Sequence, residues 1–403
     1  MALTLPRFSH LLTTALLGLA LLPFAGCKDA IDDSGLDIPP TSALAGSKKA
    51  AVTTYAEVAF ATYDDALIAA RALDAKARAF VAAPTAAGLD DLRAAWKAAR
   101  VPYNQTDAFR FYGGPIDNAS TGVESLLNAW PMEESFLDYT VGNPALGLIN
   151  NPAALPIIDK SSVEALNEQG GETNISCGYH AVEFLLWGQD LSATGPGARP
   201  FTDYSTAPNA TRRGQYLTAC TALIVDHLGP VRDAWAPGGA YRTAFTTTMP
   251  SDSALTKLLT GLGRLSKGEL AGERMQVALD NQDQEDEHSC FSDNTDQDLK
   301  GNEQGIVNVI TGTYTRTNGT QIKGASLADA VKTADAAKGG SLLAAATQAK
   351  TAVDAIQAPF DQEIIGADSA PGRQRVRTAV TSCRAQADQI VAAARALDIT
   401  LVL

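Results

Sequence analysis

The chain has 403 residues and a formal net charge of −13, and 45% of its residues are hydrophobic. This apolar content is enough to build two substantial cores. A protein this acidic repels nucleic acid and favours cations, so we expect no nucleic-acid partner.

Residues 1–26 have the pattern of a bacterial secretory signal. A charged start precedes an apolar run that is too short to span a membrane, and small residues stand directly before Cys27. This arrangement resembles a lipobox, so we predict cleavage before Cys27 and lipidation of its thiol. The alternative is a soluble secreted form. Residues 27–49 are predicted to be a tether between the lipid and the folded body, which places the protein in the cell envelope, on the periplasmic face or at the outer membrane.

Apolar residues recur at spacings of three and four from residue 50 onward, as in amphipathic helices. Tyr55, Val58 and Ala59 begin one such segment, and further segments follow as far as Leu397. The passage 301–324 contains several glycines and is predicted to be rich in loops. The pattern predicts an all-α helix-bundle fold with about eight helices in two groups.

Proline and glycine near residues 237–250 indicate a break between the two groups of helices. We therefore expect an N-terminal helical domain over residues 50–248 and a C-terminal helical domain over residues 249–403.

The apolar segment 175–190 contains His180 and Glu183, two residues that can bind a metal. Residues three apart share one face of a helix, so the imidazole and the carboxylate could converge on one cation. The alternative is a hydrogen-bonded pair that only fixes helix packing. The zincin motif H-E-x-x-H is absent, and the inverted form fails because Phe184 replaces its second histidine.

The segment 280–298 is strongly acidic, with 8 carboxylates among its 19 residues. Carboxylates suit hard divalent cations, and carboxylates mixed with imidazole suit iron, manganese or zinc. Glu287, His288 and Asp293 are therefore candidate ligands. The alternative is a solvated loop, although Cys290 and the phenylalanine after it indicate partial burial.

A polar and aromatic segment around residues 96–117 contains Arg100, Asp107 and Arg110 at helical spacing. These residues could form ion pairs that lock helix ends. Asp107 and Glu124 are also candidate metal ligands, and the two arginines could hold ligand carboxylates in place or bind an anionic chelator that carries the metal.

Four cysteines remain apart from Cys27, namely Cys177, Cys220, Cys290 and Cys383. In an exported protein they most simply form two disulfides, for which three connectivities exist. Pairing Cys177 with Cys220 and Cys290 with Cys383 keeps each bridge within one half of the chain. A zinc site that uses the C-x-x-H spacing of Cys177 is the alternative.

Residues 178–183 complete the motif G-x-H-x-x-E, which resembles the imelysin family of bacterial envelope proteins. The segments 96–117, 124–138 and 285–298 resemble the iron-regulated branch of that family. The resemblance implies two packed all-α domains, each like a four-helix bundle, with His180 and Glu183 near a site between them. It also implies a role in iron acquisition and, for some members, a peptidase activity.

The leading hypothesis is a lipid-anchored envelope protein that takes part in iron uptake and binds iron, or another divalent metal such as zinc, through His180 and Glu183. Its expected partners are the metal ion or an iron chelate, the membrane through the N-terminal lipid, and a transporter or receptor. The second hypothesis is a metal-dependent endopeptidase, and the third is a non-catalytic partner-binding surface protein. We assign no catalytic residue, because no local spacing supplies three metal ligands and a general base.

Overall fold

The computed structural model describes residues 41–403. The signal segment, Cys27 and the first part of the expected tether lie outside these residues. The longest helix, α1 (Thr41–Ala82), begins nearer the N-terminus than residue 50. Lys48 is buried, and its Nζ donates to Asp252 Oδ1 and to the Leu397 carbonyl oxygen, each at 2.8 Å. The chain from Thr41 onward therefore belongs to the folded body and not to a tether.

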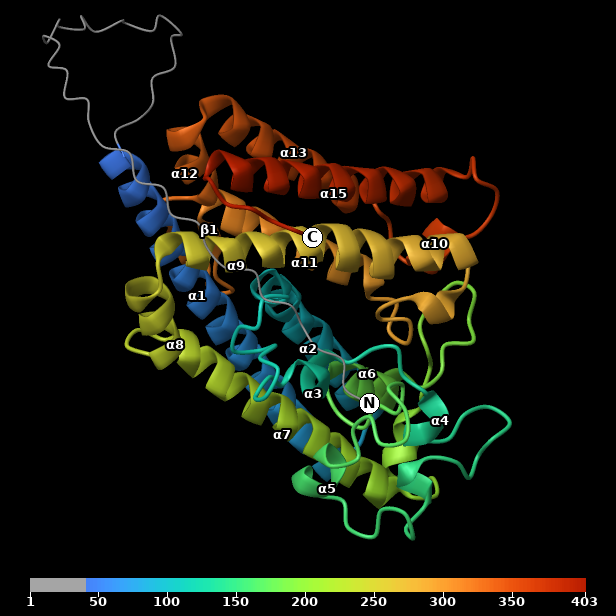
Figure 1. Ribbon diagram of the computed structural model, residues 1–403. Helices are drawn as coiled ribbons and strands as arrows, with labels where there is room; N and C mark the ends of the chain where they lie inside the picture. The colour runs from blue at the N-terminus through green and yellow to red at the C-terminus, as the bar shows by residue number, and fades with distance from the viewer. Residues whose placement is uncertain (1–40) are drawn as a thin grey trace, which may run out of the picture. The chain divides into compact units, whose positions relative to one another are not determined.

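The first group of helices packs along α1 (Figure 1). Many alanines and aromatic residues of α1 are buried. Its main members are α2 (Ala86–Gln105), α6 (Tyr179–Trp187) and α7 (Ala210–Trp235). The Thr85 hydroxyl caps α2 by accepting a hydrogen bond from Gly88 N at 3.0 Å. Short helices and loops join α2 to α7 on both sides of α6: η1 (Thr106–Phe109), α3 (Glu124–Asn128), α4 (Glu134–Leu137), η2 (Leu148–Asn150), α5 (Lys160–Glu164) and η3 (Phe201–Tyr204).

The second group of helices begins after α8 (Ala240–Thr243) and the π-helical η4 (Ala244–Thr248). In it, α9 (Ser251–Arg264), the π-helical η5 (Leu265–Gln276) and α10 (Val277–Asn281) follow one another without a break. Figure 1 shows α15 beside this run, and α13 packs against α15 and α11. The other elements are η6 (Gln284–Asp286), α11 (Thr295–Thr311), α12 (Leu327–Ala334), α13 (Ala336–Asp354), α14 (Asp361–Ile364) and α15 (Pro371–Ala396).

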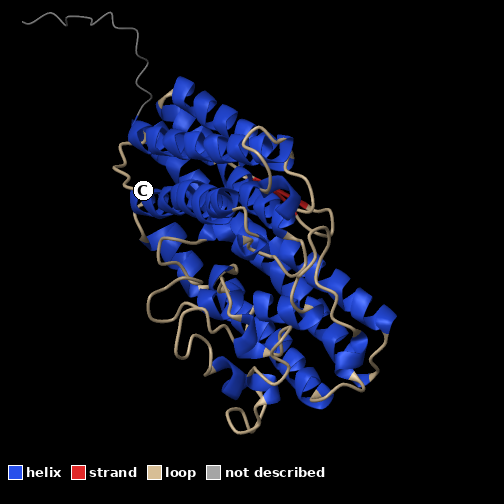
Figure 2. Ribbon diagram, turned by 90° about the vertical axis from the view of Figure 1, so that its right-hand side faces the viewer, coloured by secondary structure: helices blue, strands red, loops and turns tan. Residues whose placement is uncertain are grey.

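The passage 301–324 differs from the loop that the sequence predicted. Its first part is helical, since α11 extends to Thr311, and its second part forms a hairpin of β1 (Thr313–Thr315) and β2 (Gln321–Lys323) (Figure 2). A Cβ at Gly301 would lie 2.7 Å from Asn104 Cβ, and one at Gly305 would lie 2.5 Å from the Gln105 carbonyl oxygen. These glycines allow α11 to approach α2 closely, a packing role that outweighs their low helix propensity.

The all-α architecture is confirmed, and the described residues belong to one compact unit. The expected division at residue 248 falls between η4 and α9, and it stays a prediction. α1 contacts α2 and α7 of the first group and also α9 and α12 of the second, so it links the two groups. Within residues 41–403, none of the helices combines the length and the hydropathy that a membrane span requires.

Candidate functional site

The start of α6 is set by Gly178, which immediately precedes the helix. Its φ of 93° lies in the left-handed region, and a Cβ there would lie 2.7 Å from the Leu127 carbonyl oxygen. Only glycine fits both constraints. This sharp entry places His180 and Glu183 in the first turns of a buried helix.

His180 and Glu183 form a buried pair that Ser292 completes. His180 Nδ1 lies 2.9 Å from Glu183 Oε2, and Glu183 Oε1 accepts hydrogen bonds from Ser292 N at 3.0 Å and Ser292 Oγ at 2.6 Å. Burial raises the pKa of Glu183 to about 8 and lowers the pKa of His180 well below its usual value. Both side chains are therefore neutral near pH 7. His180 Nε2 is buried and has no hydrogen-bond partner in residues 41–403.

A second imidazole and carboxylate pair lies beside the first. His288 Nδ1 is 2.8 Å from Asp298 Oδ2, and His288 Nε2 is 3.4 Å from Asn128 Nδ2. The ring centroids of His180 and His288 are 4.6 Å apart, at an interplanar angle of 76°. Burial also lowers the pKa of His288 well below its usual value. The G-x-H-x-x-E motif and the acidic segment 280–298 therefore meet at two neutral imidazoles, those of His180 and His288.

Asp298 is the most heavily hydrogen-bonded carboxylate of the site. Arg100 donates to it at 3.0 and 3.3 Å, Asn104 Nδ2 at 2.5 Å and Ser289 Oγ at 2.5 Å. The Arg100 guanidinium also lies 5.2 Å from the centroid of the Tyr179 ring. Burial opposes ionisation of Asp298, but Arg100 and the other donors outweigh it and lower the pKa of this carboxyl well below its usual value.

Asp107 anchors a neighbouring ion-pair network. It accepts hydrogen bonds from Arg274 Nη1 at 2.9 Å, Asn302 Nδ2 at 2.8 Å and Arg110 Nη1 at 3.2 Å. Arg110 Nη2 also lies 2.9 Å from Glu124 Oε1. Arg274 comes from the π-helical segment η5, so the network joins the two groups of helices.

A cavity of about 430 Å³ opens beside these pairs, and its walls are largely polar. It is lined by four glutamates and two arginines, namely Glu124, Glu168, Glu172, Glu269, Arg110 and Arg274. His288 also faces it, whereas His180 lies behind His288. With four carboxylates against two guanidinium groups, the cavity wall favours a cation.

The structure brings together most of the residues that the sequence predicted for this site. They are His180, Glu183, His288, Arg100, Asp107, Arg110 and Glu124. Glu287 and Asp293 do not join them. Neither of them lines the cavity, and burial, followed by the charges of Asp361 and Asp190, raises the pKa of both carboxyls.

Sequence reasoning missed several residues that build the site. Asp298 was recognised only as one acid in the run 280–298, because no regular spacing relates it to His288. Arg274 and Ser292 gave no sequence signal, because each reaches the site from an element far along the chain. Asn128 likewise stands in a short helix without a motif.

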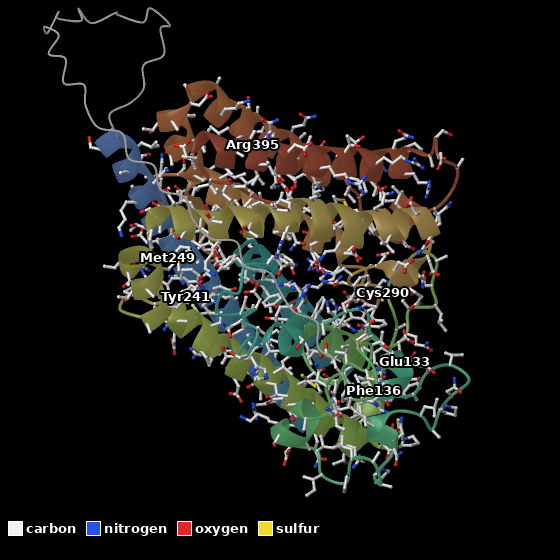
Figure 3. All side chains as sticks on the ribbon, viewed as in Figure 1. Glu133, Phe136, Tyr241, Met249, Cys290 and Arg395 are labelled. Atoms are coloured by element: carbon white, nitrogen blue, oxygen red, sulfur yellow. The ribbon has the colours of Figure 1, made fainter. Side chains whose placement is uncertain are left out.

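All four cysteines between residues 41 and 403 are free thiols, so neither expected disulfide is formed. Cys290, labelled in Figure 3, lies between α10 and α11 and is close to Glu183, whereas Cys383 lies within α15 and is close to Glu303. The Cys220 thiol donates to the carbonyl oxygen of Ser176, the residue before Cys177, and the Cys177 thiol donates to the Leu126 carbonyl oxygen, so the two thiols are near each other but not bonded.

In residues 41–403, no three His, Cys, Asp or Glu side chains converge on one point as a metal site requires. Both oxygens of Glu183 and both oxygens of Asp298 are already engaged in hydrogen bonds. The nitrogen that remains open for a metal is His180 Nε2, with the weakly engaged His288 Nε2 as its neighbour. The arrangement therefore offers imidazole donors that carboxylates hold in place, a common feature of metal sites.

Comparisons with known proteins give a consistent result. The chain is 26% identical over 266 residues to iron-regulated protein A of Synechococcus elongatus, a match that covers 64% of this chain and 62% of that relative. Its fold matches a crystal structure from Parabacteroides distasonis assigned as an iron-regulated protein A precursor, with a TM-score of 0.70 and 21% identity over 90% of this chain and 97% of the other.

An imelysin-like protein from Psychrobacter arcticum also shares the fold, with a TM-score of 0.59 and 12% identity over 89% of this chain and 98% of the other. The family model described as imelysin matches residues 59–390, which include every residue of the site described above. The chain therefore belongs to the imelysin family.

Proposed function

We propose that this protein binds iron as part of iron uptake at the cell envelope, with His180 Nε2 as the principal protein ligand. The observation that carries the proposal is the buried His180 Nε2, which has no partner in the described part of the chain. A buried nitrogen without a hydrogen bond is costly, and a metal ion would satisfy it. The similarity to a relative named iron-regulated protein A favours iron as the metal.

The role of Glu183 in this proposal is to orient His180. Its Oε2 holds Nδ1 at 2.9 Å, and Ser292 fixes its other oxygen. Asp298 holds His288 in the same way, so His288 Nε2 is the second ligand atom. Imidazoles that bind metals generally donate a hydrogen bond from the N–H of their other ring nitrogen to a carboxylate or a carbonyl, which sets the tautomer and raises ligand basicity.

The remaining ligands would come from the cavity beside His288. Glu124 and Glu269 line it. Glu124 forms an ion pair with Arg110, and Glu269 forms one with Arg274. Carboxylates combined with imidazoles form a donor set that suits iron. A bare metal ion fits this site better than an anionic iron chelate does, because Arg100, Arg110 and Arg274 are all paired with carboxylates already.

The test is metal binding by protein that lacks residues 1–27. Elemental analysis and calorimetry with ferrous, ferric and zinc ions would compare the wild type with His180→Ala and with His227→Ala. His227 is the matched control, since it lies on α7 outside the cavity. We expect stoichiometric binding by the wild type, a loss of at least about 100-fold in His180→Ala, and unchanged binding in His227→Ala. Equal affinity of His180→Ala and wild type would refute the assignment.

The envelope location rests on the sequence around Cys27, outside the described residues. Labelling with an alkyne-tagged fatty acid should mark the wild type and not Cys27→Ser. Removal of the signal segment without any label on the wild type would refute lipidation. An uptake role also calls for a transporter or receptor partner, which cross-linking on intact cells followed by purification of the adduct would detect.

A further inference from the structure

A pocket of about 440 Å³ lies at the C-terminal end of α6, and we call it the α6-end pocket. Its wall is formed by Trp187, the last residue of α6, by parts of the loop 188–200, and by residues 139–141. The Arg199 N–H donates to the Trp187 carbonyl oxygen at 2.8 Å, which folds the loop back over the end of the helix. The pocket shares no residue with the cavity beside His288.

The wall of the α6-end pocket is mostly apolar, and its rim is exposed. Val141 is 71% exposed and Leu191 is 66% exposed. Eight large hydrophobic side chains are exposed among the described residues, and these two border one pocket from separate loops. Single exposed hydrophobics are common, but an apolar hollow with exposed apolar sides is typical of an interaction site. The other apolar residues of the wall are Tyr139, Trp187, Pro196, Ala198 and Pro200.

Arg199 gives the α6-end pocket one donor that has no acceptor. Its side chain is 1% exposed, and its Nη1 donates to Asp138 Oδ2 at 2.6 Å and to Asp203 Oδ2 at 3.1 Å. Its Nε is buried and has no hydrogen-bond partner in residues 41–403. Gly188 leaves this nitrogen accessible from the pocket, since a Cβ at residue 188 would lie 3.5 Å from it. A buried N–H without an acceptor is costly, and an acceptor atom of a ligand would satisfy it.

The charges around the α6-end pocket favour a neutral acceptor over an anion. The charge of Arg199 is already balanced, because Asp138 and Asp203 both form ion pairs with it. Asp190 also lines the pocket, and its carboxylate would repel an anionic ligand. One free donor beside an apolar hollow therefore matches an uncharged residue of a polypeptide, which combines an apolar side chain with a backbone carbonyl.

We propose that the α6-end pocket docks an uncharged segment of a partner polypeptide. One large apolar side chain fills the hollow, and a backbone carbonyl accepts a hydrogen bond from Arg199 Nε. Val141 and Leu191 contact the residues on either side of that side chain. A small molecule inside the hollow would leave these two rim residues exposed, whereas a polypeptide covers them. The inference goes beyond the proposed iron binding and does not depend on it.

The test uses the full chain as cells produce it, held in lipid nanodiscs, because detergent would compete for an apolar pocket. The probe is a phage-displayed library of random peptides, selected on the wild type after removal of phage that bind empty nanodiscs. Calorimetry then measures binding of the best synthetic peptide to the wild type, Ala198→Trp, Leu191→Ser and the control Ile157→Ser. Ala198 is exposed on the pocket wall, so tryptophan there fills the hollow without loss of a buried contact. Ile157 is 68% exposed, much as Leu191 is, but it does not line the pocket.

We expect the selection to give uncharged peptides with one large apolar residue, and alanine at that residue should weaken binding at least about tenfold. Ala198→Trp and Leu191→Ser should each weaken binding of the peptide by a similar factor, and Ile157→Ser should leave it unchanged. The inference would be overturned if no peptide were selected, or if the selected peptides bound Ala198→Trp and Leu191→Ser as tightly as the wild type. Selection of acidic peptides would contradict the neutral acceptor.

Arg199→Lys tests the free donor separately. Lysine keeps a positive charge near Asp138 and Asp203 but has no N–H at the position of Nε. When circular dichroism shows that this variant is folded, it should bind the peptide at least about threefold more weakly than the wild type. Equal affinity would refute the hydrogen bond to Nε. If the variant does not fold, the comparison of Ala198→Trp with Ile157→Ser still decides whether the pocket is the docking site.

A second copy of this chain is the rival occupant of the α6-end pocket. Sedimentation velocity of the wild type over a range of concentrations should show no self-association through this surface. A dimer that Ala198→Trp abolishes and Ile157→Ser retains would make the second copy the occupant and overturn the proposal of a different partner.

Discussion

Metal binding at His180 should release one proton, which comes from Glu183. Ser292 donates two hydrogen bonds to Glu183 Oε1, so the proton of the neutral carboxyl sits on Oε2 and is donated to His180 Nδ1. In that state the ring carries its own hydrogen on Nε2. A metal can bind Nε2 only after the ring hydrogen moves to Nδ1 and Glu183 ionises.

The size of this effect follows from the pKa of Glu183, which burial raises to about 8. Below that pH the apparent metal affinity of the wild type should rise tenfold per pH unit, and above it the affinity should level off. Between pH 6 and 8 the change is about 100-fold, or roughly 2.7 kcal/mol at 1.36 kcal/mol per pKa unit.

The matched variant is Glu183→Gln, whose amide has the same shape and no proton to lose. Because Ser292 donates to the amide oxygen, the amide nitrogen donates to His180 Nδ1 and keeps the ring hydrogen on Nε2, so the glutamine supports metal binding less well than a carboxylate does. We expect a loss of about 10- to 100-fold in affinity at pH 8 and little pH dependence below it. The wild-type and variant affinities should therefore approach each other near pH 6.

The assay is calorimetry at pH 7 in two buffers with different ionisation enthalpies, using Zn²⁺ and, without oxygen, Fe²⁺. The buffer dependence of the measured heat gives the number of protons released. The wild type should release about one proton per metal ion through Glu183, and Glu183→Gln almost none. Equal proton release by the two proteins, or an equal pH slope, would refute this account of the site.

Three further predictions concern stability. Burial raises the pKa of Glu303 to about 8, so the protonated carboxyl stabilises the fold fully below about pH 4. As pH rises towards 8 the free energy of unfolding should fall by up to roughly 5 kcal/mol. Urea unfolding at several pH values should show this fall in the wild type and not in Glu303→Gln. Arg100→Met should cost about 3–5 kcal/mol in the same assay, and adding Asp298→Asn should recover at least half. Gly178→Ala should lower Tm by several degrees because of its φ of 93°, whereas Gly340→Ala on an open helix surface should not lower it.

The helical architecture was predictable because burial of one face imposes spacings of three and four on each long helix. The prediction of a loop-rich passage from residue 301 was wrong at α11 for a specific reason. Gly301 and Gly305 resemble loop residues in isolation, but they are required where α11 meets the end of α2. A single sequence shows the low helix propensity of glycine and not the neighbour that makes glycine necessary.

Pairs of site residues that are close in the sequence could be predicted, whereas pairs that are far apart could not. His180 and Glu183 lie three residues apart on one helix, so their contact follows from helix geometry. The Arg100 and Asp298 pair joins residues 198 positions apart, and no spacing rule specifies such a partner. Glu287 and His288 are neighbours, yet only His288 lines the cavity, and the sequence could not predict this because the segment between α10 and α11 is irregular and has no period.

The distribution of charge around the imidazoles determines how a metal could bind there. At the imidazoles, arginines already neutralise the buried acids Asp107 and Asp298, so a metal there would depend on neutral nitrogen donors and on the release of a proton. The irregular segment between α10 and α11 supplies His288 and Ser292 to this site, whereas its acids Glu287 and Asp293 do not line the cavity, so the segment contributes neutral groups and not charge.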